Sequence, residues 1–216
     1  MQQPATTKIY TKLHILALAV LSLIITWALL SHSATGITYS SGTYGTCAYN
    51  TCGITMVTSG TVSADITPVG GSTRCTVSSD TVTVTSGASS GYTVKLSNMY
   101  YDNLLEGPGS GPSARIFATS GTSASPSTLT ANTWGFRVDG IGGFGAGPTS
   151  SLSSGAIPSL KFASVPSSME TPELIRTTNV ADTGTVNTLV WYGVCANTSV
   201  ISGAYTGYVT YTAVIN

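Results

Sequence analysis

The sequence contains few charged residues. Asp, Glu, Lys and Arg make up 7% of the 216 residues, against about 25% in typical soluble domains. From Thr35 onward the chain carries eight acidic and six basic residues, and the basic ones form no cluster. Proteins that bind nucleic acid need a stripe of positive charge to neutralise phosphates. The composition therefore excludes nucleic acid as a partner.

Histidine is almost absent too. His14 and His32 lie in or beside an apolar N-terminal run, and the rest of the chain has none. This absence excludes Ser-His-Asp triads, Cys-His pairs and histidine zinc sites. Gly87–Gly91 fits the pattern G-x-S-x-G and Gly140–Gly145 fits G-x-G-x-x-G, but each motif works only where a strand leads into a helix. A strand-like run follows the first and a Pro- and Ser-rich stretch follows the second, so we interpret both as turns.

The acidic residues are scattered along the chain, mostly at predicted turns or strand ends. This placement favours solvated turn residues over a catalytic pair of carboxylates. Asp102, Asn103 and Glu106 share one loop and could offer oxygen ligands to calcium, but the repeated Asp-x-Asp spacing of calcium loops is missing. The sequence thus predicts a protein that is not an enzyme and that has no cofactor and no metal.

One long apolar run stands near the N-terminus, from Leu13 to Leu30. As a helix, residues 13–30 would extend about 27 Å, enough to cross the hydrocarbon core of a membrane. Lys8 and Lys12 precede the run and no charge follows until Asp65, which predicts a cytoplasmic N-terminus. A cleavable signal peptide is the alternative, since small residues follow the run. Residues 1–34 are accordingly predicted to form a cytoplasmic stub with a transmembrane or signal helix.

Polar and apolar residues alternate through the rest of the chain, as in half-buried strands. The clearest alternation lies at residues 62–66, 82–84, 92–96 and 209–215. Residues 189–194 are apolar on both faces, which is typical of a central strand covered on both sides. Because no helical period persists after Leu30, we predict an all-β sandwich over residues 53–216, with residues 35–52 as a lead-in linker.

Turn residues separate these runs. Asp139-Gly140 suits a type I′ turn, in which both central residues have positive φ. Apolar residues flank it on both sides, with Val138 before it and Ile141 after it, so the sequence predicts a hairpin here. Residues 98–130 and 140–157 are predicted to be long loops.

All four cysteines, Cys47, Cys52, Cys75 and Cys195, follow the apolar run. An even number of cysteines in an exported domain predicts disulfides. A Cys₄ zinc site is the rival, but the spacing lacks the paired knuckles of such sites. Three pairings are open to four cysteines. We favour Cys47–Cys52 and Cys75–Cys195, the second of which would join the start of one strand to the end of the central one.

Several short stretches together resemble a known group of proteins. They include Tyr44-Gly45-x-Cys47, Asn132-Thr133-Trp134-Gly135-Phe136-Arg137, Tyr192-Gly193-Val194 and Val209-Thr210-Tyr211-Thr212-Ala213. In this order they resemble uncharacterised membrane-anchored or secreted surface proteins of candidate-phyla bacteria, of the Patescibacteria and Saccharibacteria type. The resemblance implies an immunoglobulin-like or WxL-like β-sandwich at the cell surface. It implies no catalytic residues, and the exported part lacks the W-x-L signature itself.

Low charge, Ser/Thr/Tyr-rich faces and long Gly/Ser loops suit adaptable polar contacts. We therefore expect a structural or adhesive module, either anchored in the cell membrane through residues 13–30 or secreted to the cell surface. Its partner would be a protein or glycan on a host or neighbouring cell, or another protomer in a homo-oligomer. Tyr100, Tyr101 and Trp134 could anchor such contacts, although aromatic residues in β-domains more often belong to the core. The alternatives are a carbohydrate-binding module or hydrolase accessory domain, and a pilin-like filament subunit.

Overall fold

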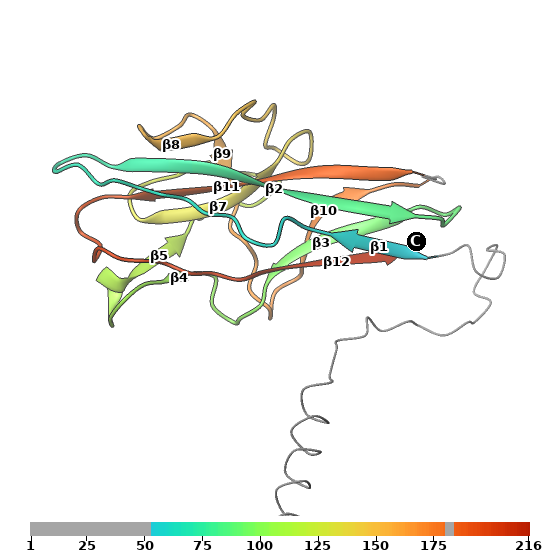
Figure 1. Ribbon diagram of the computed structural model, residues 1–216, viewed down its shortest axis with the longest axis horizontal. Coiled ribbons are helices and arrows are strands. Elements are labelled where there is room, and N and C mark those ends of the chain that lie inside the picture. The colour runs from blue at the N-terminus through green and yellow to red at the C-terminus, as the bar shows by residue number, and fades with distance from the viewer. Residues whose placement is uncertain (1–52, 180–183) are drawn as a thin grey trace, which may run out of the picture. The chain divides into compact units, whose positions relative to one another are not determined.

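The computed structural model describes residues 53–179 and 184–216, and this part of the chain is all-β (Figure 1). The predicted anchor at residues 13–30, the linker at residues 35–52 and the pair Cys47 and Cys52 lie outside the described residues. The strands are β1 (Ile54–Val57), β2 (Arg74–Ser86), β3 (Tyr92–Asn98), β4 (Leu105–Glu106), β5 (Arg115–Ala118), β6 (Ser127–Thr128), β7 (Thr133–Val138), β8 (Leu152–Gly155), β9 (Lys161–Phe162), β10 (Glu173–Thr177), β11 (Thr185–Ala196) and β12 (Val209–Ile215). A single 3₁₀ turn, η1 (Pro112–Ala114), precedes β5.

The strands form two main sheets, which pack face to face as a sandwich (Figure 1). The larger sheet has the order β1-β2-β11-β7-β5-β4, with β8 also paired to β2. The smaller sheet has the order β10-β3-β12, and β6 pairs with β9 in a separate two-stranded sheet. Except for the parallel pair β5 and β7, the strand pairs of all three sheets are antiparallel. The predicted all-β fold is thus confirmed, and the arrangement of the sheets is consistent with a β-sandwich.

The longest ladder joins β2 and β11 at the centre of the larger sheet. Its register runs from Thr185 opposite Thr85 to Ala196 opposite Arg74. Alternating Val and Thr residues favour this extended pairing, because β-branched side chains pack well on a pleated surface. The predicted strand at residues 189–194 is central, since β11 lies between β2 and β7, but it is not covered on both sides throughout, because Leu189 is exposed.

One face of this ladder packs against the smaller sheet in the main core. Val82, Val190, Leu96 and Ile175 are buried there, together with the ring of Tyr92. They come from β2, β11, β3, β10 and the start of β3 respectively. The alternation noted at residues 82–84, 92–96 and 209–215 therefore marks real strands whose apolar faces meet.

The opposite face of the ladder packs into a second, smaller core. Trp191 from β11 lies with Val77, Leu129 and Phe162, and the disulfide Cys75–Cys195 joins directly paired residues of β2 and β11 in the same cluster. Both cysteines are fully buried. The predicted pairing of Cys75 with Cys195 is confirmed, and it closes a separation of 120 residues.

Residues 62–66 are not a strand, contrary to the prediction from their alternation. They belong to a segment without ladder pairing that passes beside β2, here called the strap (residues 58–68). Side chains of β2 hold the strap by its carbonyl groups: the Thr76 hydroxyl donates to Asp65 and the Ser78 hydroxyl donates to Ser63. Because hydroxyl groups bind the strap's carbonyls, the strap lies alongside β2 without entering the sheet.

The predicted hairpin at Asp139-Gly140 is also wrong. Gly140 does have positive φ, as the turn requires, but no strand returns beside β7, and residues 139–147 form a loop. The two predicted long loops contain short elements as well: β4, η1, β5 and β6 fall within residues 98–130, and β8 falls within residues 140–157. The described residues include no helix long and apolar enough to cross a membrane.

Candidate functional site

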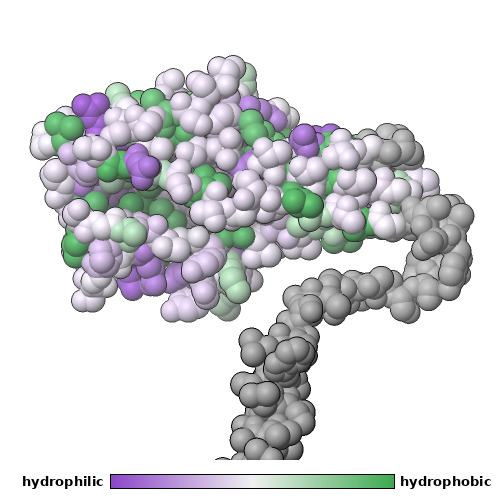
Figure 2. Space-filling view, viewed as in Figure 1, coloured by the Kyte–Doolittle hydropathy of each residue, from purple (hydrophilic) through white to green (hydrophobic). Residues whose placement is uncertain are grey.

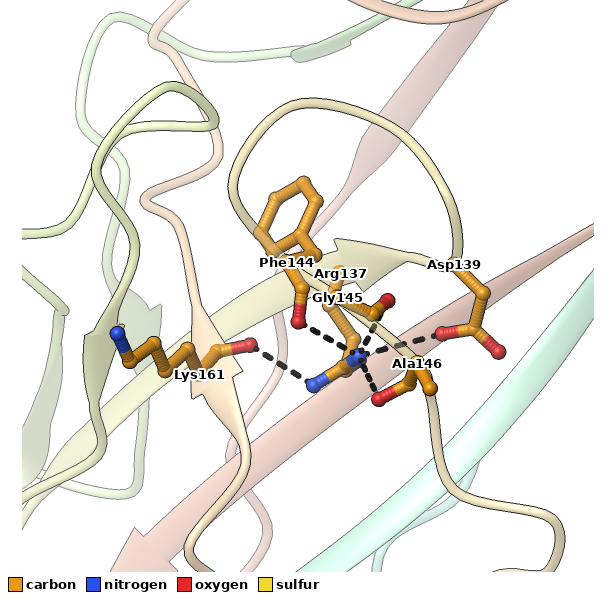
Figure 3. Close-up of polar contacts among 6 residues, drawn as sticks. All are labelled: Arg137, Asp139, Phe144, Gly145, Ala146 and Lys161. Carbon is orange, nitrogen blue, oxygen red and sulfur yellow. Dashed lines mark hydrogen bonds and ion pairs between the residues drawn. The ribbon is translucent and has the colours of Figure 1, made fainter.

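The glycine-rich loop after β7 closes around a buried arginine (Figure 3). Arg137 is 1% exposed. Its Nη2 donates to the backbone carbonyls of Phe144, Gly145 and Ala146 over distances of 3.1, 3.3 and 2.8 Å. Nη2 also lies 3.3 Å from Oδ1 of Asp139, and Nη1 donates to the Lys161 carbonyl. Carbonyl oxygens thus surround the guanidinium on the side of the loop.

The same contacts explain why the loop needs glycine. A Cβ at Gly147 would lie within 2.0 Å of the Asp139 carboxylate, and a Cβ at Gly142 would lie 2.3 Å from the Ser123 carbonyl oxygen. Gly142 and Gly145 also adopt positive φ, which glycine tolerates best. No helix follows this loop in the described chain, so the G-x-G-x-x-G pattern here shapes a structural loop that covers Arg137.

A groove of about 1090 Å³ opens elsewhere, between the two sheets. One wall is the strap, and the other is the β11–β12 connection (residues 197–208). Figure 2 shows the domain hollowed at the end away from the C-terminus, with hydrophobic residues in the hollow. The groove exists because the smaller sheet covers only part of the inner face of the larger one.

Both walls are fixed by hydrogen bonds. On the connection, Thr206 exchanges two backbone hydrogen bonds with Glu106 of β4, of 3.0 and 2.8 Å. The Tyr205 hydroxyl donates to the Ile201 carbonyl at 2.8 Å. On the strap, the Ser59 amide donates to Oδ1 of Asp80 at 2.9 Å and the Ser59 hydroxyl donates to the same oxygen. The groove is therefore formed before any ligand arrives.

A polar cluster lies at the base of the groove. Asp80 on β2, Tyr192 on β11 and Tyr211 on β12 all line it. The two tyrosine hydroxyls are 2.6 Å apart and join the two sheets across the sandwich. Burial raises the pKa of both phenols well above the ordinary range, and the negative charge of Asp80 acts in the same direction. Both hydroxyls therefore stay protonated and serve as hydrogen-bond donors.

The predicted contact residues are found in different surroundings. Tyr100 and Tyr101 are exposed, and Tyr100 packs edge-on against Tyr208, which lines the groove. Trp134 is only 4% exposed and its indole nitrogen donates to the Asn103 carbonyl at 2.8 Å. Trp134 is thus largely buried, and it is one of the residues that line the groove.

Two of the three residues considered as calcium ligands have other partners. Glu106 lies 3.9 Å from Arg115 in an exposed ion pair, and the Asn103 amide donates to Ser164. Among the residues that the structure describes, no three His, Cys, Asp or Glu side chains are grouped as metal ligands would be.

Sequence reasoning missed Asp80, Tyr192 and Tyr211 as neighbours. In the sequence, Tyr192 and Tyr211 each fit the alternation of a strand as ordinary core residues. Asp80 looks like an acidic residue exposed to solvent. One signal was present: Asp80 interrupts an alternating strand at an inward position, between Ser78 and Val82. An acid on the buried face of a strand indicates a polar site, because unpaired charge is costly in a core.

We expect Arg137→Met to destabilise the domain by about 3–5 kcal/mol, since it leaves buried carbonyls without a donor. Arg115→Met, which removes the exposed ion pair with Glu106, is the matched control and should change stability by less than about 1 kcal/mol. Urea unfolding of both variants measures the difference. Equal effects would show that the loop does not depend on Arg137.

No protein-family model, no curated protein and no solved structure matches the chain.

Proposed function

We propose that this chain is a non-catalytic binding module, displayed outside the cell membrane, that holds its ligand in the groove between the strap and the β11–β12 connection. The observation that carries this proposal is the groove itself, whose walls are fixed and whose base combines aromatic rings with a buried carboxylate. Ligand sites are commonly such concave surfaces, mostly apolar with a few placed polar groups.

The chemistry of the groove supports binding over catalysis. Among the described residues, Asp65 and Asp80 are its only titratable groups apart from tyrosines, and none of its lining residues there is a lysine, arginine or histidine. A nucleophile needs an adjacent base, and acid–base catalysis needs groups that exchange protons near neutral pH. Tyr192 and Tyr211 hold their protons too firmly for this role.

Export is supported by the disulfide and by the apolar run at residues 13–30. A buried disulfide between Cys75 and Cys195 forms and persists in an oxidising compartment. We infer an immunoglobulin-like or WxL-like surface sandwich, similar to those of candidate-phyla bacteria, anchored through residues 13–30. Its partner would be a protein or glycan outside the cell, or a second copy of the chain.

Protease treatment of intact cells tests the display. With one epitope at each end of the chain, added protease should remove the C-terminal epitope and leave the N-terminal one. Detergent-permeabilised cells, in which both epitopes are accessible, provide the control. A C-terminal epitope that survives on intact cells but disappears after permeabilisation would contradict the proposal.

A carbohydrate-binding module is the second candidate. The exposed ring of Tyr208 lines the groove and packs against the exposed ring of Tyr100, which Tyr101, also exposed, follows in the chain. Such rings stack on sugars. Glycan-array binding that disappears in Tyr101→Ala, with Val57→Ala as a control for loss of an exposed apolar side chain, would identify it. Array binding that both variants retain would argue against these tyrosines.

A further inference from the structure

Asp80 is a buried carboxylate that has no cationic partner in the described part of the chain. It is 5% exposed, and neither of the two ion pairs found among the described residues includes it. Buried carboxylates are normally paired with a cation or bound to a metal, because removing the charge from water is costly. Among the described residues, the hydrogen-bond donors to Asp80 are neutral, namely the amide and the hydroxyl of Ser59.

The two tyrosine hydroxyls that line the groove with Asp80 carry no positive charge that could balance it. They lie 2.6 Å apart, and one of them donates to the other. The base of the groove therefore carries the negative charge of Asp80.

The rest of the groove lining adds to this potential. In the part of the chain that the structure describes, its charged residues are Asp65 and Asp80, and no basic residue lines it. Aromatic side chains also line it, namely Trp134, Tyr192, Tyr205, Tyr208 and Tyr211. The faces of such rings attract cations. Anionic ligands such as phosphates and carboxylates are disfavoured here, and a cation is favoured.

We propose that the groove binds an aliphatic ammonium group, with the cation at Asp80 and its hydrocarbon chain along Val62 and Val209. Both side chains line the same groove. Val62 stands between Ser59, which binds Asp80, and Ser63, which binds Ser78, and Val209 lies two residues before Tyr211 on β12. A divalent metal is a poorer fit, because calcium takes six to eight oxygen ligands and Asp80 already accepts two hydrogen bonds. This inference rests on the proposed function, since it names the ligand of the same groove.

The competing explanation is that Asp80 only fastens the strap through Ser59. Asp80→Asn separates the two roles, because the amide oxygen still accepts from Ser59 while the negative charge is lost. Asp65→Asn is the matched control. Asp65 also lines the groove, but its side chain is exposed on the strap.

The test is a titration of the full chain in detergent micelles, followed through the backbone amide signals of Ser59, Asp80 and Tyr192. The probes are n-pentylammonium and 1,5-diaminopentane, with 1-pentanol and pentanoate as neutral and anionic analogues of the same chain. We expect both ammonium probes to bind at least about tenfold more tightly than 1-pentanol, as a charged hydrogen bond warrants, and Asp80→Asn to remove this preference. Asp65→Asn should change this preference by no more than about twofold, because an exposed charge contributes little to binding.

Two further arms identify the source of the amine. A short peptide with a free lysine side chain is compared with its acetylated-lysine form and with 1,5-diaminopentane. Binding of the diamine alone indicates a free amine, whereas loss of peptide binding on acetylation indicates a lysine of a partner protein. Either result supports the proposal.

Equal affinity for n-pentylammonium and 1-pentanol in the unmodified chain would overturn the proposal, and this comparison needs no variant to fold. An ammonium preference that persists in folded Asp80→Asn would also overturn it. Failure here is distinguishable from failure of the binding-module function: a neutral probe that shifts the groove amides and binds as tightly as n-pentylammonium refutes the ammonium ligand alone, whereas a protease-protected domain refutes surface display.

Discussion

The pairing of β2 with β11 is the constraint on which the rest of the domain depends. One face of this ladder packs in the main core, and the other packs in the second core around Cys75, Val77, Trp191 and Cys195. The disulfide between Cys75 and Cys195 fastens its end and removes a 120-residue loop from the freedom of the unfolded chain, which contributes about 4–5 kcal/mol in the chain-entropy view. Few charged side chains are available to fix the loops, and hydrogen bonds such as those from β2 to the strap hold them against this frame.

The groove follows from the same constraint. β2 and β11 are longer than the strands of the smaller sheet, so that sheet leaves part of their inner face uncovered. The strap and the β11–β12 connection border the uncovered part, and polar residues can stand at its base without being sealed in a core. Asp80 is tolerated on an inward position of β2 for this reason, because its hydrogen-bond partners and the open groove replace part of its hydration.

The strands that the sequence predicted best are those with one buried face, such as β3 and β12, and the central β11 with two. The alternation of apolar and polar residues within one strand shows which of its faces is buried, so the sequence of that strand alone is enough to predict it. The strap was predicted to be a strand because its apolar residues alternate with polar ones. Val62 and Ile66 do line the groove, but side-chain hydroxyls from β2 bind the backbone of the strap, so it forms no ladder. The loop over Arg137 and the cluster of Asp80, Tyr192 and Tyr211 could not be predicted, since each joins residues from distant parts of the chain.

Amide hydrogen exchange of the full chain tests most directly whether the β2–β11 ladder supports the fold. The slowest amides among residues 53–179 and 184–216 should lie in β2 and β11. In Cys75→Ala/Cys195→Ala they should exchange about a thousandfold faster, as a loss of about 4 kcal/mol requires, whereas Cys47→Ala/Cys52→Ala, which leaves this disulfide intact, should leave them protected. Slowest exchange in β3 and β12, or unchanged protection without the Cys75–Cys195 bond, would contradict this account.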